Sequence, residues 1–510
     1  MSRNYIKSLN NLLTKGPTRV IASRAIRKGT PETDEFAARI RKETENADRK
    51  ESDRMLKMYK RYYSLSRSVQ LMPEHMRDAG EDAEHISRAE ELRDQVLYGE
   101  SPADEERLEQ IRAELIGLET DNYMKYIKAL YIKKIIPEVY RQFSERDVED
   151  KILFLQPRRT LNPSCRYMYR TLQAMGRSEV RLCELYHGRV SLTEEYNNCV
   201  EFIKDMATAR AVVTHEFNEY FGYLDIRKET KLIQLWHGCG IIKGLGMSTA
   251  GMEGSEFKTM DEYREYPEFE GYDLVTIPGE AERRIFEEFM GRPHNSPEIQ
   301  AVGVSRTDEF FSEKYREKCY KKIYERIPAA RQKKIILYAP TFRGLEPERY
   351  APDKLDIGAF AEKLSDRYIL VIKHHQTAKI LPEIPEKYRG SFAFDMTHGS
   401  GMDINELMTV SDICITDYSS LVFEYSLFER PIVFFMFDKD EYRDSRGMYY
   451  TYDELAECGP IFETNEGVIN YIDNIDDGFD RSKVASFRDR YMNACDGKST
   501  ERIIDFIYRA

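Results

Sequence analysis

The chain has 510 residues, of which 41% are hydrophobic and 12% aromatic, and its formal net charge is −12. This length predicts roughly three domains, and the composition excludes general disorder. The negative balance gives no support for nucleic acid as a partner, because a phosphate-binding surface needs excess lysine and arginine.

The basic and helical patterns come first along the chain. Residues 1–30 carry seven Lys or Arg and no acid, which is typical either of an element resting on anionic lipid or of a solvated basic tail. A helix cap and a helix-starting proline follow at Ser101 and Pro102. An apolar stripe then recurs at helical spacing: Leu108, Ile111, Leu115 and Leu118. We predict a charged, mainly helical region over 1–150 that contacts a membrane or a partner.

Short apolar runs separated by helix-like spans begin at residue 151, which favours a parallel sheet covered on both faces. The first set of predicted strands is 151–157, 180–186, 211–217, 231–237, 273–278 and 299–304. After a charged helix the second set is 333–340, 368–375, 391–396, 413–418 and 431–437. We therefore predict α/β domains over 151–325 and 326–485, with a C-terminal helix at 486–510 and a ligand cleft between the domains.

Chemically useful residues gather at the predicted strand ends. The carboxyl ends of parallel strands share one edge of a sheet, so these side chains are expected to lie close together. They are His237, Thr341, Arg343, Lys373, His374, His375, Asp417, Ser419 and Ser420.

Ser419 and Ser420 precede a predicted helix, where hydroxyl and backbone N–H groups bind anions. The alternative is plain helix capping. Glu424 lies one turn further, where a carboxylate could accept hydrogen bonds from a ribose. Arg343 and Lys373 would supply charge for a pyrophosphate, although Arg343 is also compatible with a surface salt bridge.

Several motifs in fixed order resemble the CDP-glycerol glycerophosphotransferase family, which comprises the teichoic acid polymerases and primases. They are W-H-G (236–238) with Lys243, V-G-V-S-R-T-D (302–308), L-Y-A-P-T-F-R (337–343), I-K-H-H (372–375) and S-D-I-C-I-T-D-Y-S-S (411–420). The resemblance covers roughly residues 150–465. It implies a GT-B fold, in which two Rossmann-type domains face a cleft.

The resemblance also implies roles for individual residues. His237 matches the catalytic base and His375 the histidine that contacts the donor phosphates. Thr341 and Arg343 match the P-T-x-R turn, and the donor-binding segment corresponds to Asp417, Ser419, Ser420 and Glu424. The chain departs from the family at Cys239-Gly240-Ile241, where Thr-Pro-Leu is common, and at Gln376 and Glu424.

The implied reaction transfers a glycerol-phosphate or related unit from a CDP-alcohol to an acceptor hydroxyl and releases CMP. His237 would remove the proton from that hydroxyl, and the glycines after it would let the acceptor approach closely. Without the resemblance, a core histidine with satisfied hydrogen bonds is the favoured interpretation of His237. The implied partners are a CDP-alcohol donor and a lipid-linked or glycan polyol-phosphate acceptor, in the cytoplasm at the inner face of a bacterial membrane.

No His, Cys or carboxylate cluster has the spacing of a metal site, and we expect no cofactor. Asp438-Lys439-Asp440 is assigned to the structure of the cleft. Two alternatives remain: a nucleotide-sugar glycosyltransferase or epimerase of the same fold, and a non-catalytic glycan-binding or scaffold protein. Glycerol and ribitol donors, and priming and polymerising reactions, are not distinguished by these motifs.

Overall fold

The computed structural model describes residues 77, 83–98, 128–129, 131–157, 161–185, 192–251, 259–344, 349–399 and 401–509. The chain forms two compact units, of which Tyr140–Leu185 with Phe202–Ala510 carries both sheets. The other unit is Met1–Val139 with Tyr186–Glu201. The predicted basic element at 1–30 and the apolar stripe at 108–118 lie outside the described residues.

Helix α5 (Ala83–Tyr98) belongs to the unit that contains Met1–Val139. A π-helix (Tyr131–Ile135) leads into α7 (Ile136–Phe143). Within the described ranges, no helix combines the length and the apolar character that crossing a membrane requires.

The first sheet has six parallel strands in the order β2-β1-β3-β4-β5-β6. The strands are β1 (Glu149–Gln156), β2 (Glu179–Glu184), β3 (Ala209–Thr214), β4 (Lys231–Gln234), β5 (Leu274–Thr276) and β6 (Ile299–Gln300). The helices of the same unit are α8 (Pro163–Met175), α10 (Met260–Glu265), α11 (Arg283–Met290) and the 3-10 helices η2 (Gly246–Thr249), η3 (Glu280–Glu282) and η4 (Ser305–Phe311). Helix α9 (Leu192–Met206) begins in the other unit and ends in this one. The strand order reverses between β1 and β3.

The second sheet has six parallel strands in the order β12-β11-β10-β7-β8-β9, the Rossmann order. The strands are β7 (Lys334–Tyr338), β8 (Tyr368–Ile372), β9 (Ala393–Asp395), β10 (Ile413–Thr416), β11 (Ile432–Phe435) and β12 (Ile461–Phe462). Its helices are α13 (Ile357–Leu364), α14 (Ile404–Val410), α15 (Leu421–Ser426), α16 (Lys439–Arg446), α17 (Tyr452–Ala456), α18 (Asn465–Asp473) and α19 (Ile475–Gly478). The order reverses between β7 and β10, so ligands are expected at their carboxyl ends.

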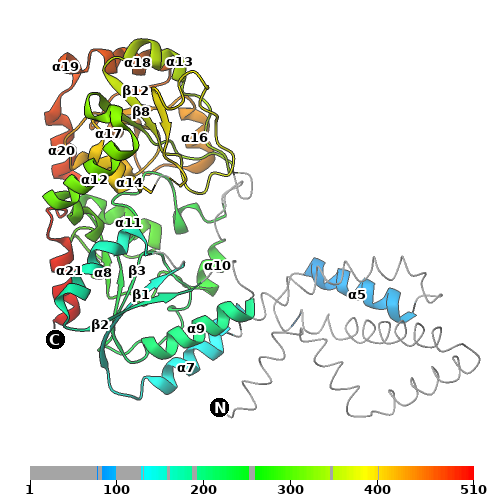
Figure 1. Ribbon diagram of the computed structural model, residues 1–510. Coiled ribbons are helices and arrows are strands. Elements are labelled where there is room, and N and C mark those ends of the chain that lie inside the picture. Colours follow the sequence, from blue (N-terminus) through cyan, green and yellow to red (C-terminus); the bar gives the residue numbers. More distant parts are fainter. Residues whose placement is uncertain are drawn as a thin grey trace, which may run out of the picture. The chain divides into compact units, whose positions relative to one another are not determined.

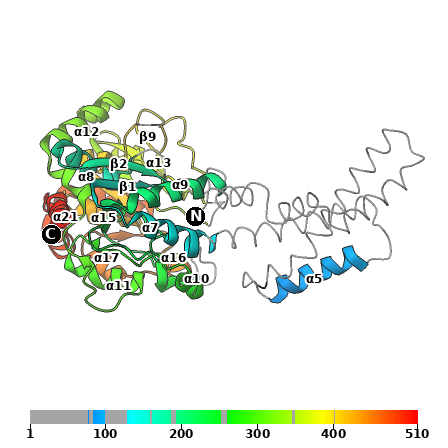
Figure 2. The same cartoon turned by 90° about the horizontal axis from the view of Figure 1, so that it is seen from below.

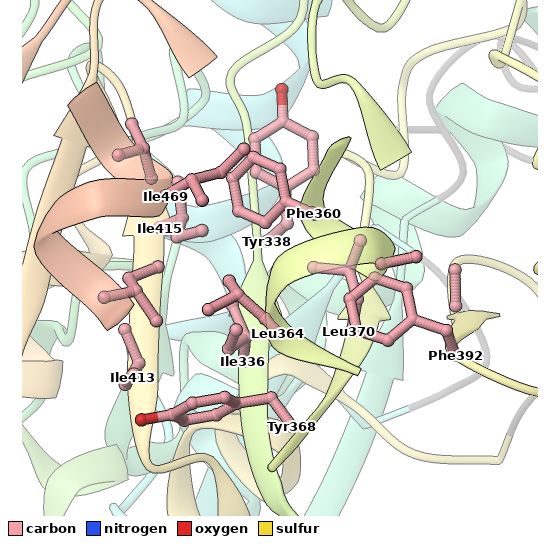
Figure 3. Packing of buried hydrophobic residues seen from close by; sticks show 14 of the residues in the cluster. Ile336, Tyr338, Phe360, Leu364, Tyr368, Leu370, Phe392, Ile413, Ile415 and Ile469 are labelled. Carbon is pink, nitrogen blue, oxygen red and sulfur yellow. The ribbon is translucent and has the colours of Figure 1, made fainter. Parts of the chain in front are cut away.

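Helices cover the sheets because the central strands, such as β3 and β8, are apolar and buried along almost their whole length. In Figure 3, Ile336, Leu370 and Ile415 from the second sheet pack against Phe360 and Leu364 of α13 and Ile469 of α18. Burying each such side chain contributes about 1.5–3 kcal/mol. The core therefore holds the strand ends of this domain in fixed positions.

The chain ends by returning to the first sheet. Helix α12 (Glu313–Arg326) and the 3-10 helix η5 (Pro328–Arg331) connect the domains, and α20 (Arg481–Tyr491) packs Phe487 on Phe423 of α15 at 5.2 Å between ring centroids. Helix α21 (Ser499–Tyr508) then buries Ile503 and Ile507 in the core of the first sheet. It lies beside α8 in both ribbon views (Figures 1 and 2).

All eleven predicted strands are present, and the pair of α/β sheets confirms the predicted fold class. Strand β12 was not predicted, because two residues are too few to produce a sequence pattern. The domain boundaries at 150, 325 and 485 stay a prediction.

Candidate active site

A strained turn follows β4. Trp236 has a left-handed backbone with φ of 60°, which is rare for a bulky residue. Its N–H donates to Oε1 of Gln234 at 2.8 Å, and its indole packs among aromatic rings that include Phe289. This anchored turn ends the strand and presents the exposed ring of His237.

The surroundings of His237 keep its ring neutral. Desolvation by the neighbouring protein lowers the pKa of His237 to about 4 even though part of the residue is exposed, and the charges of Arg306, Lys243 and His375 act in the same direction. A hydrogen bond with the backbone of His215 opposes this shift. A neutral imidazole carries a proton on one nitrogen and leaves the other as a proton acceptor.

Arg306, which the sequence analysis did not select, connects the His237 turn to the second domain. Its buried guanidinium donates to the carbonyl of His237 and to Oδ1 of Asn405 in α14. It also lies 3.8 Å from Oε1 of Glu424 in α15. Arg306 lies in the motif V-G-V-S-R-T-D, which could have drawn attention to it. The motif gives no indication of its three partners, because they are distant in sequence.

Close packing requires glycine at two positions after His237. A Cβ added at Gly238 would lie 3.3 Å from Oγ of Ser420, and one at Gly240 would lie 2.3 Å from the ring of Phe423. The sequence analysis explained these glycines by the approach of an acceptor. In the structure they allow the turn to lie directly against the start of α15.

Asp417 joins the ends of β7 and β10 at the point where the strand order reverses. Its Oδ1 accepts the N–H of Thr341 at 2.8 Å and that of Tyr418 at 2.7 Å. Its Oδ2 accepts from Arg343 at 2.9 Å. The carboxylate is 2% exposed, so Asp417 acts here by fixing the neighbouring backbone.

Arg343 is bound by protein on all sides. Its Nε and one terminal nitrogen donate to both oxygens of Asp438 at 2.7 and 3.0 Å, and another terminal nitrogen donates to the carbonyl of Thr341 at 2.7 Å. The ring of Tyr442 lies 4.7 Å from its guanidinium carbon. A phosphate contact would have to replace one of these bonds, and the role predicted for Arg343 stays a prediction. The bond to Asp438 agrees with the assignment of 438–440 to structure.

His375, on the second domain, is close to two cationic side chains, Lys243 and Arg349. Its exposed ring packs on Phe342 at 5.0 Å between centroids. Desolvation by the surrounding protein lowers the pKa of His375 to about 4, and the charges of Lys243 and Arg349 contribute. Both cations also lie over the Phe342 ring, at 5.6 and 4.7 Å from its centroid. Neither Arg349 nor Phe342 was predicted. Phe342 lies in the motif L-Y-A-P-T-F-R but is apolar, and Arg349 lies outside the motifs.

A short antiparallel contact ties Lys243 to the second domain. Lys243 forms a bridge with Met448, and the N–H of Gly244 donates to the carbonyl of Gly447 at 3.0 Å. This pairing brings a residue of the first domain beside His375. The two histidines, Lys243 and Arg306 therefore meet where the domains join.

Two predicted donor-binding residues, Lys373 and Glu424, have partners that bear on their roles. Nζ of Lys373 donates to three carbonyls, those of Met396, Thr397 and Met402, at 2.7, 3.1 and 3.1 Å. Burial raises the pKa of Glu424, against the opposing effects of Arg306 and Cys239. The Glu424 side chain is 2% exposed, which leaves a ribose contact at this residue as a prediction.

Ser419 and Ser420 precede the short helix α15. Oγ of Ser419 accepts the N–H of Leu421 at 3.4 Å, whereas Ser420 makes no capping hydrogen bond with its side chain. Both are half-buried. Plain capping therefore does not account for Ser420, whose hydroxyl faces the His237 turn.

No group of three or more His, Cys, Asp or Glu in the described part of the chain is placed to hold a metal ion. The arrangement thus offers a neutral imidazole, a cationic surface formed by Lys243 and Arg349, and the hydroxyl of Ser420. These groups suit proton removal beside a phosphate.

Comparison with known proteins agrees with this chemical arrangement. Residues 140–509 match the model of the family described as CDP-Glycerol:Poly(glycerophosphate) glycerophosphotransferase. The chain is 33% identical over 321 residues to the teichoic acid poly(ribitol-phosphate) polymerase of Bacillus spizizenii, covering 62% of this chain and 49% of that protein. It is 30% identical over 306 residues to the teichoic acid glycerol-phosphate primase of Bacillus subtilis, covering 59% and 74%.

Among solved structures, the wall teichoic acid polymerase TagF aligns with a TM-score of 0.59 at 23% identity, covering 76% of this chain and 96% of that chain. This likeness shows the fold. The chain spans about half the length of two ribitol-phosphate polymerases that it matches, at 49% and 51%.

Proposed function

The chain belongs to the CDP-glycerol:poly(glycerophosphate) glycerophosphotransferase family, and from that premise we propose that it transfers a polyol-phosphate unit from a CDP-alcohol to an acceptor hydroxyl. The observation that carries the proposal is the neutral ring of His237 beside Lys243, Arg306 and His375. A base must be unprotonated to accept a proton, and phosphate oxygens need nearby positive charge.

In the proposed reaction, His237 accepts the proton of the acceptor hydroxyl as its oxygen attacks the β-phosphorus of the CDP-alcohol. The new phosphorus–oxygen bond forms while the bond to the bridging oxygen breaks, and CMP leaves with that oxygen. Lys243 and Arg349 offset the charge on the phosphates. His375 and Ser420 donate hydrogen bonds to phosphate oxygens, and Asp417 and Arg343 hold the surrounding backbone.

The relatives include proteins described as ribitol-phosphate and glycerol-phosphate enzymes, and both primases and polymerases. One TagF crystal was soaked with CDPG. We therefore place a polyol phosphate on the donor and a polyol-phosphate chain, lipid-linked or on a glycan, as the acceptor. The proposed setting is the inner face of a bacterial membrane, with 1–30 as the predicted contact.

The test is release of CMP from CDP-glycerol and CDP-ribitol, with UDP-sugars as alternative donors, in the wild type and in His237→Ala. Turnover of a CDP-alcohol should fall by roughly 10²–10⁴-fold in the variant while donor binding persists. His294→Ala removes an imidazole that is 80% exposed and serves as the matched control.

Turnover of only a UDP-sugar would replace the proposed donor while keeping the fold. Absence of binding to any nucleotide would instead favour the scaffold alternative.

A further inference from the structure

A basic pocket of about 450 Å³ lies beside α14, apart from His237 and His375. Its lining comes from α8, α12, the segments after β8 and β9, and the start of α14. The basic lining residues are Arg166, Arg170, Lys318, Lys322 and Lys373, and the acidic ones are Asp403 and Glu406. Pockets of this volume are large enough for small-molecule ligands.

The two carboxylates are already satisfied by the protein. Asp403 accepts from Arg166 at 2.5 Å and caps α14 by accepting the N–H of Glu406 at 3.0 Å. Glu406 accepts from Lys322 and from the N–H of Asp403. Neither acid is therefore available to neutralise the other cations of the pocket.

Arg170 and Lys318 carry the remaining charge. Arg170 follows Arg166 by four residues on α8, and Lys318 precedes Lys322 by four on α12, so each pair shares one helix face. Within the described residues, neither Arg170 nor Lys318 has an ion-pair or hydrogen-bond partner, and both are exposed. Lys373 adds an ammonium held by carbonyls at the base of the lining. The pocket is positive in a chain whose net charge is −12.

The pocket and the candidate active site share helix α14. Asn405, which binds Arg306, is adjacent in sequence to Glu406, which lines the pocket. An α-helix with its side chains is about 10–12 Å wide. A ligand of several linked units could therefore occupy the pocket while its end lies near the His237 turn.

The lining favours a phosphodiester chain over a nucleotide. None of the described residues that line it is aromatic, although bases commonly stack on aromatic rings. We propose that this pocket binds phosphate groups of the polyol-phosphate acceptor chain, behind the hydroxyl that attacks. This inference rests on the proposed function, which supplies a polyanionic acceptor. It assigns that acceptor chiefly to Arg170 and Lys318, which lie outside the predicted donor site.

The test is calorimetric binding of a defined glycerol-phosphate oligomer of several units to the full chain, with CDP-glycerol and inorganic phosphate titrated separately. The variants are Arg170→Glu and Lys318→Glu. Both side chains are exposed, so folding should be retained, and thermal unfolding checks this. Lys483→Glu, an exposed lysine on α20, gives the same change in net charge away from the pocket.

Each pocket variant should weaken oligomer binding by roughly three- to tenfold and reduce its salt dependence, while CDP-glycerol binding and the Lys483→Glu control stay unchanged. Unchanged oligomer binding would overturn the inference. Weakened CDP-glycerol binding alone would assign the pocket to the donor and would also overturn it. Should the chain release no CMP, the proposed function fails, while oligomer binding still decides whether the pocket holds phosphodiesters.

Discussion

The guanidinium of Arg306 donates to the backbone carbonyl of His237, and in this way a side chain bound to the second domain holds the proposed base. The same charge lowers the pKa of His237. Arg306 thus acts on His237 both by position and by electrostatics, and these effects can be separated by substitution.

Arg306→Gln removes the charge and keeps one donor. We expect the pKa of His237 to rise, so that the acid limb of kcat/KM moves to higher pH. Arg306→Lys keeps the charge but cannot hold two acceptors in the same geometry, so activity should fall by about tenfold or more with the limb unmoved. Rate–pH profiles of both variants measure this. A common shift in both variants would contradict the electrostatic role.

The pH dependence of the wild type follows from the two histidines. His237 and His375 have pKa values lowered to about 4, and each is neutral above that value. If neutral His237 is the base, kcat/KM should stay level as the pH falls through 6.5 and decline only near pH 4. The apparent value belongs to the coupled pair. A decline centred near 6.5 would show that the ring is not perturbed in the working enzyme.

The free energy of unfolding should fall at acid pH because His215 is buried in its neutral form. Its side chain is buried, and desolvation lowers the pKa of His215 to about 3, with His237 and Arg306 contributing. Unfolded chains protonate histidine near pH 6.5, so between about 6.5 and 3 the unfolded state binds the additional proton and stability falls as the pH falls. The contribution of His215 to this slope should approach about 1.4 kcal/mol per pH unit at most. His215→Gln should reduce the slope in denaturant titrations at several pH values.

Gly240→Ala tests the packing of the His237 turn on α15. The added methyl would meet the ring of Phe423 at 2.3 Å, and such overpacking costs about 1–3 kcal/mol. Thermal unfolding should show this loss. Phe423→Leu in the same chain should relieve part of it, because the two substitutions act on one contact. Additive effects of the two changes would argue against a direct clash.

Substitutions of Arg343 distinguish a structural role of this residue from contact with the substrate. Arg343→Met leaves the carboxylates of Asp417 and Asp438, which are 2% and 16% exposed, without their cation. We expect a loss of about 3–5 kcal/mol in the free energy of unfolding. Asp438→Asn should cost less, since Arg343 keeps Asp417. If Arg343 instead contacts the donor phosphates, Arg343→Lys should raise the Kd for CDP-glycerol with little loss of stability.

The sequence alone was sufficient to predict the strands and the sheet edge at which the candidate catalytic and binding residues lie. Buried parallel strands are apolar throughout, and their carboxyl ends share one edge, so His237, Thr341, His375 and Asp417 could be grouped from the pattern alone. The family motifs then connected these residues to a reaction. Strand β12 was missed because two residues carry too little pattern.

What each side chain touches was decided only by the tertiary structure. Lys373 points to three carbonyls and Glu424 faces Arg306, although both occupy the motif positions that predicted a ligand contact. Arg306 joins His237, Asn405 and Glu424 from three separate segments, and only the packing of two sheets brings these together. Strand periodicity fixes which residues share an edge, whereas side-chain direction beyond a strand end depends on loops and neighbouring helices that no local pattern specifies.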